Sequence, residues 1–432
     1  MARSTETHCF NRRAAMIAGA SLSTAALAGR ASAAGSGPRQ WWGWRGPDGK
    51  NTAAAGATPP AGIADQNVAW SVEVPGRGHS SPIVVDDSIY LTTADKTAGT
   101  QSVLAFRRDG KPDWTQVVHD GGIPGDNHRN NTEASPTLAY DGEGLFAAFY
   151  NSDAIWLTKL STTGKIIWQQ NIGRYHPNQY KYGYAASPLV YRDSVIINAD
   201  FDGQSFLAAV DRRTGKPIWK VKRPGKTSFS SPIVANIAQR DQLLLSGGEM
   251  VAAYSPDDGT MLWKVDGAAT MATCGTMVWD NDLVFASGGY PGNKTVCIAA
   301  NGTTDDGKRS ERWSNSSKCY EQSLLAHDGL LFAVADSGVA FCWRCRDGEL
   351  MWRQRLGGKY SSSPLLVGDT LYVFSETGNG FAFAASPDGY KDRGQSKLGD
   401  EIFASPVFVD DTLYLRVAKQ VGHRQEYLLA IR

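Results

Sequence analysis

The chain has 432 residues, of which 42% are hydrophobic and 20% are charged, and its formal net charge is +1 at pH 7. A balance so close to neutral argues against nucleic acid or an anionic membrane surface as a partner. No apolar stretch is long enough to cross a bilayer as a helix, so we expect a globular protein without a transmembrane segment.

Residues 1–33 have the order of features found in an export signal. A twin arginine, Arg12-Arg13, precedes a mildly apolar stretch over 14–29, and Ala31-Ser32-Ala33 provides a cleavage site of small residues. These features predict a twin-arginine-type signal peptide and a soluble protein that is periplasmic or otherwise exported. A disordered N-terminus that carries two arginines is the alternative. Without the signal, the chain has a net charge of −2.

Residues 34–66 are rich in Gly, Ala and Pro and include the cluster Trp41-Trp42-Gly43-Trp44. We expect an ordered lead-in without strands that packs on the domain over residues 67–432.

That domain is an eightfold repeat. One half of each repeat is a Ser-Ser-Pro or Ala-Ser-Pro motif before alternating apolar residues, and the other half ends in Gly-x-x-x-Trp. The motif prolines are Pro82, Pro136, Pro188, Pro232, Pro364 and Pro406, and degenerate copies lie around Cys274-Gly275 and Glu321-Gln322. Repeats of about 40–50 residues built from short strands are typical of β-propellers. The sequence therefore predicts an all-β fold, an eight-bladed β-propeller of four-stranded antiparallel blades.

The two ends of the repeat region predict how the ring closes. The last repeat starts at Pro406 and ends at Ile431, after only three strands, whereas 67–72 resembles a fourth strand with no preceding three. We expect these N- and C-terminal strands to pair and complete one blade, because closure removes an exposed sheet edge. The repeat tryptophans recur at one position per blade, which favours packing between blades over a cofactor stack.

Five cysteines follow the signal: Cys274, Cys297, Cys319, Cys342 and Cys345. An odd number leaves at least one thiol unpaired or intermolecular. Cys342 and Cys345 lie in a predicted strand, where residues three apart point to opposite faces, so we predict neither a zinc site nor a redox motif. Cys274 and Cys319 both lie near the start of innermost strands in adjacent blades and are the pair we predict to form a disulfide; the other pairings stay open.

The motif Asp-x-x-Thr-Gly-Lys-x-x-Trp over 211–219, together with the Ser-Pro motif, resembles the pyrroloquinoline-quinone-like, or quinoprotein-like, eight-bladed propeller superfamily. Residues 128–137 and 44–49 resemble exported bacterial members. The resemblance implies a binding or scaffold role, since the fold is also that of the outer-membrane β-barrel assembly scaffold. It implies as the alternative a periplasmic alcohol or sugar dehydrogenase that depends on pyrroloquinoline quinone (PQQ). The alcohol enzymes use an adjacent Cys-Cys pair, a calcium site and an Asp base; this chain has no adjacent Cys pair and no residues that align with that calcium site.

Two long loops lead into innermost strands of neighbouring blades, over 118–133 and 173–184, and should lie side by side. Tyrosines and amides give large contact area and directional hydrogen bonds, which suit a protein, peptide or polysaccharide ligand. The candidate ligand-binding residues are His128, Asn131, Glu133, His176, Tyr180, Tyr182 and Tyr184. The alternative is that the loops pack on each other and only cover the channel mouth.

No catalytic or metal-binding motif accompanies these loops. His119, Asp120, His128 and His176 match no metal-ligand spacing, and no Gly-x-Ser-x-Gly, phosphate-binding loop or HExxH motif occurs. We therefore predict a monomeric, exported propeller without a catalytic site, cofactor or metal, which binds its ligand through loops on the channel face.

Overall fold

The computed structural model describes residues 40–432, apart from 126, 270–271, 293 and 301–310. The predicted signal peptide and the first residues of the lead-in lie outside this part of the chain. The described residues form one compact unit. Within the described residues, no helix has both the length and the apolar character needed to cross a membrane; the one helical element there is a 3-10 turn, η1, at Asp65–Asn67.

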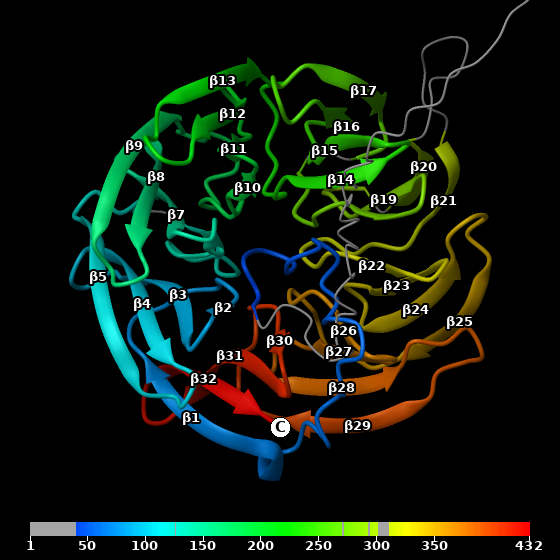
Figure 1. Ribbon diagram of the computed structural model, residues 1–432. Helices are drawn as coiled ribbons and strands as arrows, with labels where there is room; N and C mark the ends of the chain where they lie inside the picture. Colours follow the sequence, from blue (N-terminus) through cyan, green and yellow to red (C-terminus); the bar gives the residue numbers. More distant parts are fainter. Residues whose placement is uncertain (1–39, 126, 270–271, 293, 301–310) are drawn as a thin grey trace, which may run out of the picture. The chain divides into compact units, whose positions relative to one another are not determined.

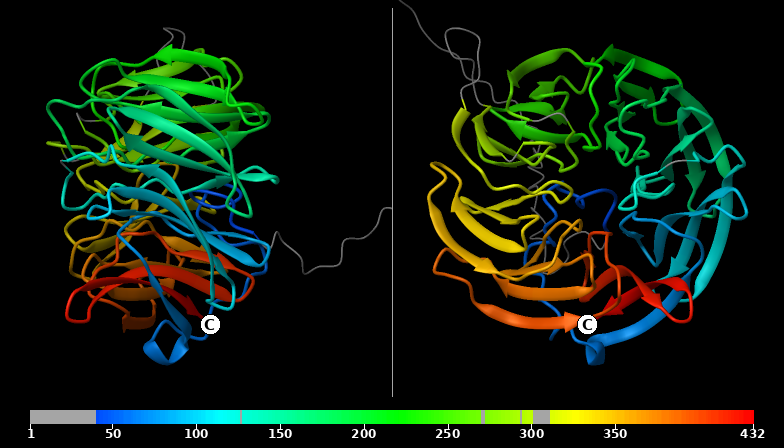
Figure 2. Two further views of the ribbon diagram at one scale, coloured as in Figure 1. Left: turned by 90° about the vertical axis from the view of Figure 1, so that its left-hand side faces the viewer. Right: turned by 180° about the vertical axis from the view of Figure 1, so that it is seen from behind.

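Eight four-stranded antiparallel sheets surround a common axis, as Figures 1 and 2 show, so the predicted eight-bladed propeller is confirmed. In seven blades the four strands follow one another from the axis outward. The first four of these are β2 Ile83–Val85, β3 Ser88–Asp95, β4 Thr100–Arg107 and β5 Pro112–Asp120; β6 Ala139–Tyr140, β7 Gly144–Asn151, β8 Ala154–Ser161 and β9 Ile166–Arg174; β10 Leu189–Tyr191, β11 Ser194–Ala199, β12 Phe206–Asp211 and β13 Pro217–Lys222; β14 Ile233–Ile237, β15 Arg240–Gly247, β16 Met250–Tyr254 and β17 Met261–Asp266. The next three are β18 Val278–Asp280, β19 Leu283–Ser287, β20 Thr295–Ala299 and β21 Glu311–Asn315; β22 Leu325–His327, β23 Leu330–Val334, β24 Val339–Arg344 and β25 Leu350–Arg355; β26 Leu365–Val367, β27 Thr370–Phe374, β28 Asn379–Ala384 and β29 Asp392–Lys397.

The eighth blade joins the two ends of the propeller. Its strands β30 Val407–Val409, β31 Thr412–Gln420 and β32 Arg424–Ile431 are completed by β1 Val68–Val74, which pairs with β32. The predicted closure is therefore confirmed. The apolar partners alternate along the pair, with Val72 opposite Leu428, and each strand satisfies hydrogen bonds that an open edge would leave unpaired.

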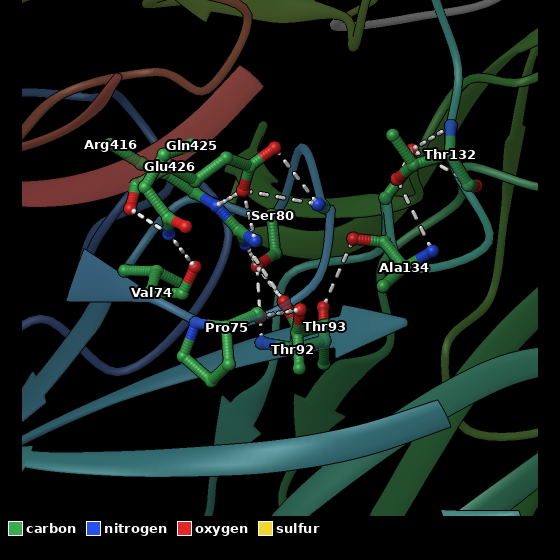
Figure 3. Close-up of polar contacts among 12 residues, drawn as sticks. Val74, Pro75, Ser80, Thr92, Thr93, Thr132, Ala134, Arg416, Gln425 and Glu426 are labelled. Atoms are coloured by element: carbon green, nitrogen blue, oxygen red, sulfur yellow. Dashed lines mark hydrogen bonds and ion pairs between the residues drawn. The ribbon is translucent and has the colours of Figure 1, made fainter. Parts of the chain in front are cut away.

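A buried ion pair reinforces this closure on the side facing the first blade (Figure 3). Arg416 Nη2 of β31 lies 2.6 Å from Glu426 Oε2 of β32, and both side chains are only 2% exposed. Arg416 Nη1 also donates to Ser80 Oγ at 3.2 Å and to the carbonyl of Thr92 at 2.8 Å, both of the first blade. A buried ion pair needs such additional partners to offset the cost of removing the charges from water.

The tryptophans hold adjacent blades together, as predicted, and explain the glycine of the repeat. Trp114 Nε1 donates to the carbonyl of Thr162 at 3.1 Å in the next blade. Gly164 there has φ +86°, and a Cβ at that position would lie 2.9 Å from the Trp114 ring. Both the backbone conformation and the lack of space therefore exclude a side chain. The same contact recurs between Gly110 and Trp70, Gly215 and Trp168, Gly259 and Trp219, and Gly348 and Trp313.

The hydroxyl of the Ser-Pro motif forms a second link between blades. The backbone N–H just before one innermost strand donates to the hydroxyl of the next blade, as from Ser363 to Ser405 Oγ at 2.8 Å. The other links run from Ser81 to Thr137, Thr137 to Ser187, Ser187 to Ser231, Thr276 to Ser323 and Ser323 to Ser363. In the second blade the hydroxyl belongs to Thr137, two residues beyond Ser135 of the motif, because β6 begins only at Ala139.

The lead-in lies near the axis of the ring, where Figure 1 draws it in dark blue, and contacts several innermost strands. Trp41 forms a bridge with Val84 of β2, and Thr52 with Leu366 of β26. The buried Arg45 donates to the carbonyls of Gly49 and Leu324, each at 3.0 Å. Burial lowers the pKa of Arg45 to about 10. These contacts hold the lead-in against the innermost strands of the first and seventh blades.

All five described cysteines are free, so the predicted Cys274–Cys319 disulfide is wrong. Cys319 is buried in an apolar cluster between two blades, whereas Cys274 lies on the channel wall. Cys342 and Cys345 belong to different apolar clusters, which confirms that they face opposite sides of their sheet. Burial raises the pKa of Cys342 to about 12, so this thiol stays protonated and unreactive.

Candidate ligand-binding pocket

A pocket of about 420 Å³ lies at the axis, with Trp44 of the lead-in in its wall. Its volume and its mixture of aromatic rings with a few polar groups are typical of sites for small molecules or peptide side chains. Besides Trp44, the described residues that line it are His79, His128, Asn130, Asn131, Ser135, Thr137, Tyr180, Tyr182, Ala185, Ser187, Phe229, Ser231, Cys274, Thr276, Tyr290, Tyr320, Glu321, Ser361, Phe403 and Ser405.

The structure brings four of the seven predicted site residues to this pocket: His128, Asn131, Tyr180 and Tyr182. The two long loops lie side by side, as predicted. Asn131 Nδ2 donates to the carbonyl of Tyr182 at 2.6 Å, and the rings of His128 and Tyr182 have centroids 4.8 Å apart. Partial burial, followed by the nearby charge of Arg129, lowers the pKa of His128, which favours the neutral imidazole.

The other three predicted site residues do not line the pocket. Glu133 is buried and forms an ion pair with Lys96 at 3.1 Å. His176 is partly exposed, with Nδ1 2.9 Å from Asp153 Oδ1. Tyr184 is buried in the core of its blade and donates to the carbonyl of Asn198 at 2.9 Å. Both loops begin later than expected, because β5 extends to Asp120 and β9 to Arg174. The ends of the two loops pack into the blades, so their terminal side chains do not reach the pocket.

A second set of pocket residues, one from each blade, was not predicted from the sequence. Each lies two positions before the residue that carries the interblade hydroxyl, and all eight line the pocket: His79, Ser135, Ala185, Phe229, Cys274, Glu321, Ser361 and Phe403. The signal was present in the repeat, because once the hydroxyl residues are aligned, this position ranges from Ala185 to Phe229 to Glu321, whereas the aligned position itself is always Ser or Thr. This position places the aromatic rings of Phe229 and Phe403 in the pocket wall. The ring of His79 stacks on that of Phe403, with centroids 4.3 Å apart.

The charge of the pocket is carried by one acid. Among the described lining residues Glu321 is the only carboxyl group, and neither lysine nor arginine occurs. Burial keeps the pKa of His79 well below its ordinary value, and the charge of Arg77 adds to this effect. No group of three His, Cys, Asp or Glu within the described ranges has a geometry that could hold a metal ion.

The fold and the repeats define a quinoprotein-like eight-bladed propeller. The family model described as "Outer membrane protein assembly factor BamB" matches residues 42–180, 127–348 and 302–419, and the chain belongs to this family. One curated relative, tetrathionate hydrolase of Acidithiobacillus ferrooxidans, is 20% identical over 324 residues; the match covers 68% of this chain and 62% of that protein. The chain thus spans less than two thirds of the length of this relative.

Several solved structures share the fold. BamB of Moraxella catarrhalis superposes with a TM-score of 0.61 at 13% identity, covering 84% of this chain and 99% of that one. A europium-containing methanol dehydrogenase reaches 0.66 at 13% identity over 91% of this chain and 98% of that one. Quinohemoprotein alcohol dehydrogenase of Comamonas testosteroni reaches 0.66 at 12% identity, over 91% and 80%. At such identities the likeness concerns the fold, which assembly factors and dehydrogenases share.

Proposed function

We propose that this protein is an exported binding or scaffold propeller that holds a segment of a protein, peptide or polysaccharide ligand in the pocket at its axis. The observation that carries the proposal is the pocket wall, which combines aromatic rings with amide and hydroxyl groups contributed by all eight blades. Aromatic side chains provide much of the contact energy in such sites, and the polar groups orient the ligand. The family membership supports a protein partner.

The dehydrogenase alternative requires PQQ, and the pocket does not fit this cofactor. PQQ is a tricarboxylate, so its burial calls for basic side chains that compensate its charge. The described residues that line the pocket include no lysine or arginine and do include the carboxyl group of Glu321. The whole sequence also lacks an adjacent Cys-Cys pair. We therefore derive no redox step for this chain.

Export to the periplasm as a soluble monomer is part of the same proposal. It is supported by the signal-like features of residues 1–33 and by the closed ring, in which β1 covers the edge of the last blade. Because β1 pairs with β32, the last blade does not expose the edge of β32 to a second copy.

Site-specific photocrosslinking tests the proposed function. A benzophenone amino acid replaces Tyr180 in the pocket and, as the control, the half-exposed Ile218 on outer strand β13. The purified protein is irradiated in periplasmic extract, and adducts are identified by mass spectrometry. We expect a discrete adduct from position 180 that disappears when Tyr182→Ala is added. The same adducts from both positions, or none from position 180, would contradict the proposal.

A further inference from the structure

Two carboxyl groups share one hydroxyl at the pocket wall. Ser361 Oγ lies within hydrogen-bond distance of Glu321 Oε2 and 2.9 Å from Glu376 Oε1. A serine hydroxyl has a single proton to donate, so it can serve only one of these oxygens as donor. The other contact becomes a hydrogen bond when one of the carboxyl groups carries a proton. The geometry of the three side chains therefore suits one shared acidic proton and one negative charge.

The surroundings of Glu321 fit this arrangement. Burial raises the pKa of Glu321, and the charges of Glu376 and Asp336 add to the rise, against the lowering by hydrogen bonds with Ser361 and Asn130. Asn130 Nδ2 donates to Glu321 Oε1 at 3.0 Å. When two carboxyl groups share a site, each disfavours the ionised form of the other, which raises the pKa of one of them.

The positive charges around this site do not reach the acid pair directly. Lys318 Nζ lies 5.1 Å from the centre of the Tyr320 ring and 4.0 Å from Asp336 Oδ2. Partial burial and Arg129 lower the pKa of His128, and burial raises the pKa of Cys274, so both groups favour their neutral forms. Thus no cation among the described lining residues balances a second negative charge on the acid pair.

Aromatic rings share the pocket with Glu321 and Ser361. Tyr182, Phe229 and Tyr320 line the same pocket, and Tyr182 stacks on Phe229 with centroids 6.3 Å apart. The faces of such rings attract cations, most strongly where water is excluded. A cationic group such as an ammonium satisfies both the rings and a second carboxylate, whereas a ligand carboxylate or phosphate finds no basic partner among the described lining residues.

We propose that the pocket accepts an alkylammonium group of its ligand, which takes the place of the proton shared by Glu321, Ser361 and Glu376. The displaced proton passes to solvent, and no covalent bond changes. The inference rests on the proposed binding function and specifies its ligand: a segment that presents a lysine side chain or another amine. Affinity should rise with pH as the acid pair loses its proton, and should fall again only when the amine itself is deprotonated.

Binding of defined amines tests the inference. The probes are Nα-acetyl-lysine methylamide, its Nε-acetylated neutral form and its Nε-trimethylated form, titrated calorimetrically into the whole protein in two buffers of different ionisation enthalpy. We expect the free lysine probe to bind at least about tenfold more tightly than the acetylated probe and to release a proton. Comparable binding of the trimethylated form would show that the pocket accepts quaternary ammonium groups as well as the lysine side chain.

The isosteric variant Glu321→Gln should weaken binding of the lysine probe about tenfold and abolish proton release. Glu143→Gln, at a side chain that is 62% exposed, is the matched control and should change neither. Equal binding of charged and neutral probes, an unchanged affinity in Glu321→Gln with an unchanged melting temperature, or no binding of either cationic probe overturns the inference. If position 180 still crosslinks a ligand in that case, the proposed binding function stands and only the ammonium assignment falls.

Discussion

The contacts between blades and the pocket at the axis use the same repeat in opposite ways. Between blades, one solution recurs around the ring: a tryptophan packs over a glycine of the next blade at five described places, and a hydroxyl accepts the N–H of the previous blade at six. In the pocket, the position two residues before that hydroxyl differs from blade to blade, from Ala185 to Phe229 to Glu321. Invariance within a repeat therefore identifies what holds the fold, and variation at a fixed position identifies what the fold presents to a ligand.

The largest loss of stability should come from reopening the ring. Deletion of β1, Val68–Val74, leaves the full length of β32 as an open edge and removes the partner of an apolar strand. We expect aggregation, or a melting temperature lowered by more than 10 °C or so. Size-exclusion chromatography and a thermal scan measure both. A deletion variant that stays monomeric and melts like the parent would show that the ring does not depend on this closure.

What could be predicted from the sequence follows the same division between the blade contacts and the pocket. The eight blades, the closing strand and the role of the tryptophans were predictable, because each rests on a local pattern that recurs. The pocket was only half predictable. The loops over 118–133 and 173–184 stood out by length, but length does not separate Tyr182, which faces the pocket, from Tyr184, which packs into the core. Glu321 lay in a degenerate copy of the motif, so its place on the channel wall became clear only from the aligned hydroxyls.

The next largest loss of stability should come from removing a single tryptophan that packs between blades. Trp352 is 8% exposed, contacts Phe332 and Phe383, and donates to the carbonyl of Ser386 in the next blade at 2.7 Å. Trp352→Ala should lower the free energy of unfolding by about 3–5 kcal/mol. Trp42→Ala, at a side chain 42% exposed, is the control and should cost about 1 kcal/mol or less. Equal losses in denaturant titrations of the two variants would contradict interblade packing as the source.

A smaller, pH-dependent effect is expected at Asp141 of the second blade. Its side chain is inaccessible to solvent and contacts Lys159 Nζ at 2.9 Å and Arg212 Nη1 at 3.0 Å. Burial alone would raise the pKa of Asp141, but hydrogen bonds from Lys159, from the backbone and from Arg212 outweigh it and lower the pKa below 3.8.

Because the folded protein favours the ionised form of Asp141, its contribution to stability is present above the unfolded-state pKa and is lost as the pH falls through the folded-state value. Asp141→Asn should therefore destabilise by about 2 kcal/mol at pH 7, and this loss should shrink as the pH falls below 3.8. Melting temperatures of parent and variant across this range measure the difference. A gap between the two that stays constant with pH would show that the carboxylate charge is not the cause.

The smallest effect on stability is expected from the pocket, and two tyrosines of one loop provide the comparison. Tyr182 is half-buried, and its backbone carbonyl accepts from Asn131, a bond that survives truncation of the side chain. Tyr182→Ala should therefore change the free energy of unfolding by less than about 1 kcal/mol. Tyr184 is 5% exposed and buries its hydroxyl against the carbonyl of Asn198, so Tyr184→Ala should cost about 3–5 kcal/mol. If the pocket binds a ligand, crosslinking from position 180 should be lost in Tyr182→Ala while the protein remains folded. Should Tyr182→Ala unfold as readily as Tyr184→Ala, the loop would be a structural cover of the channel, and the variable positions of the other blades would have to carry recognition alone.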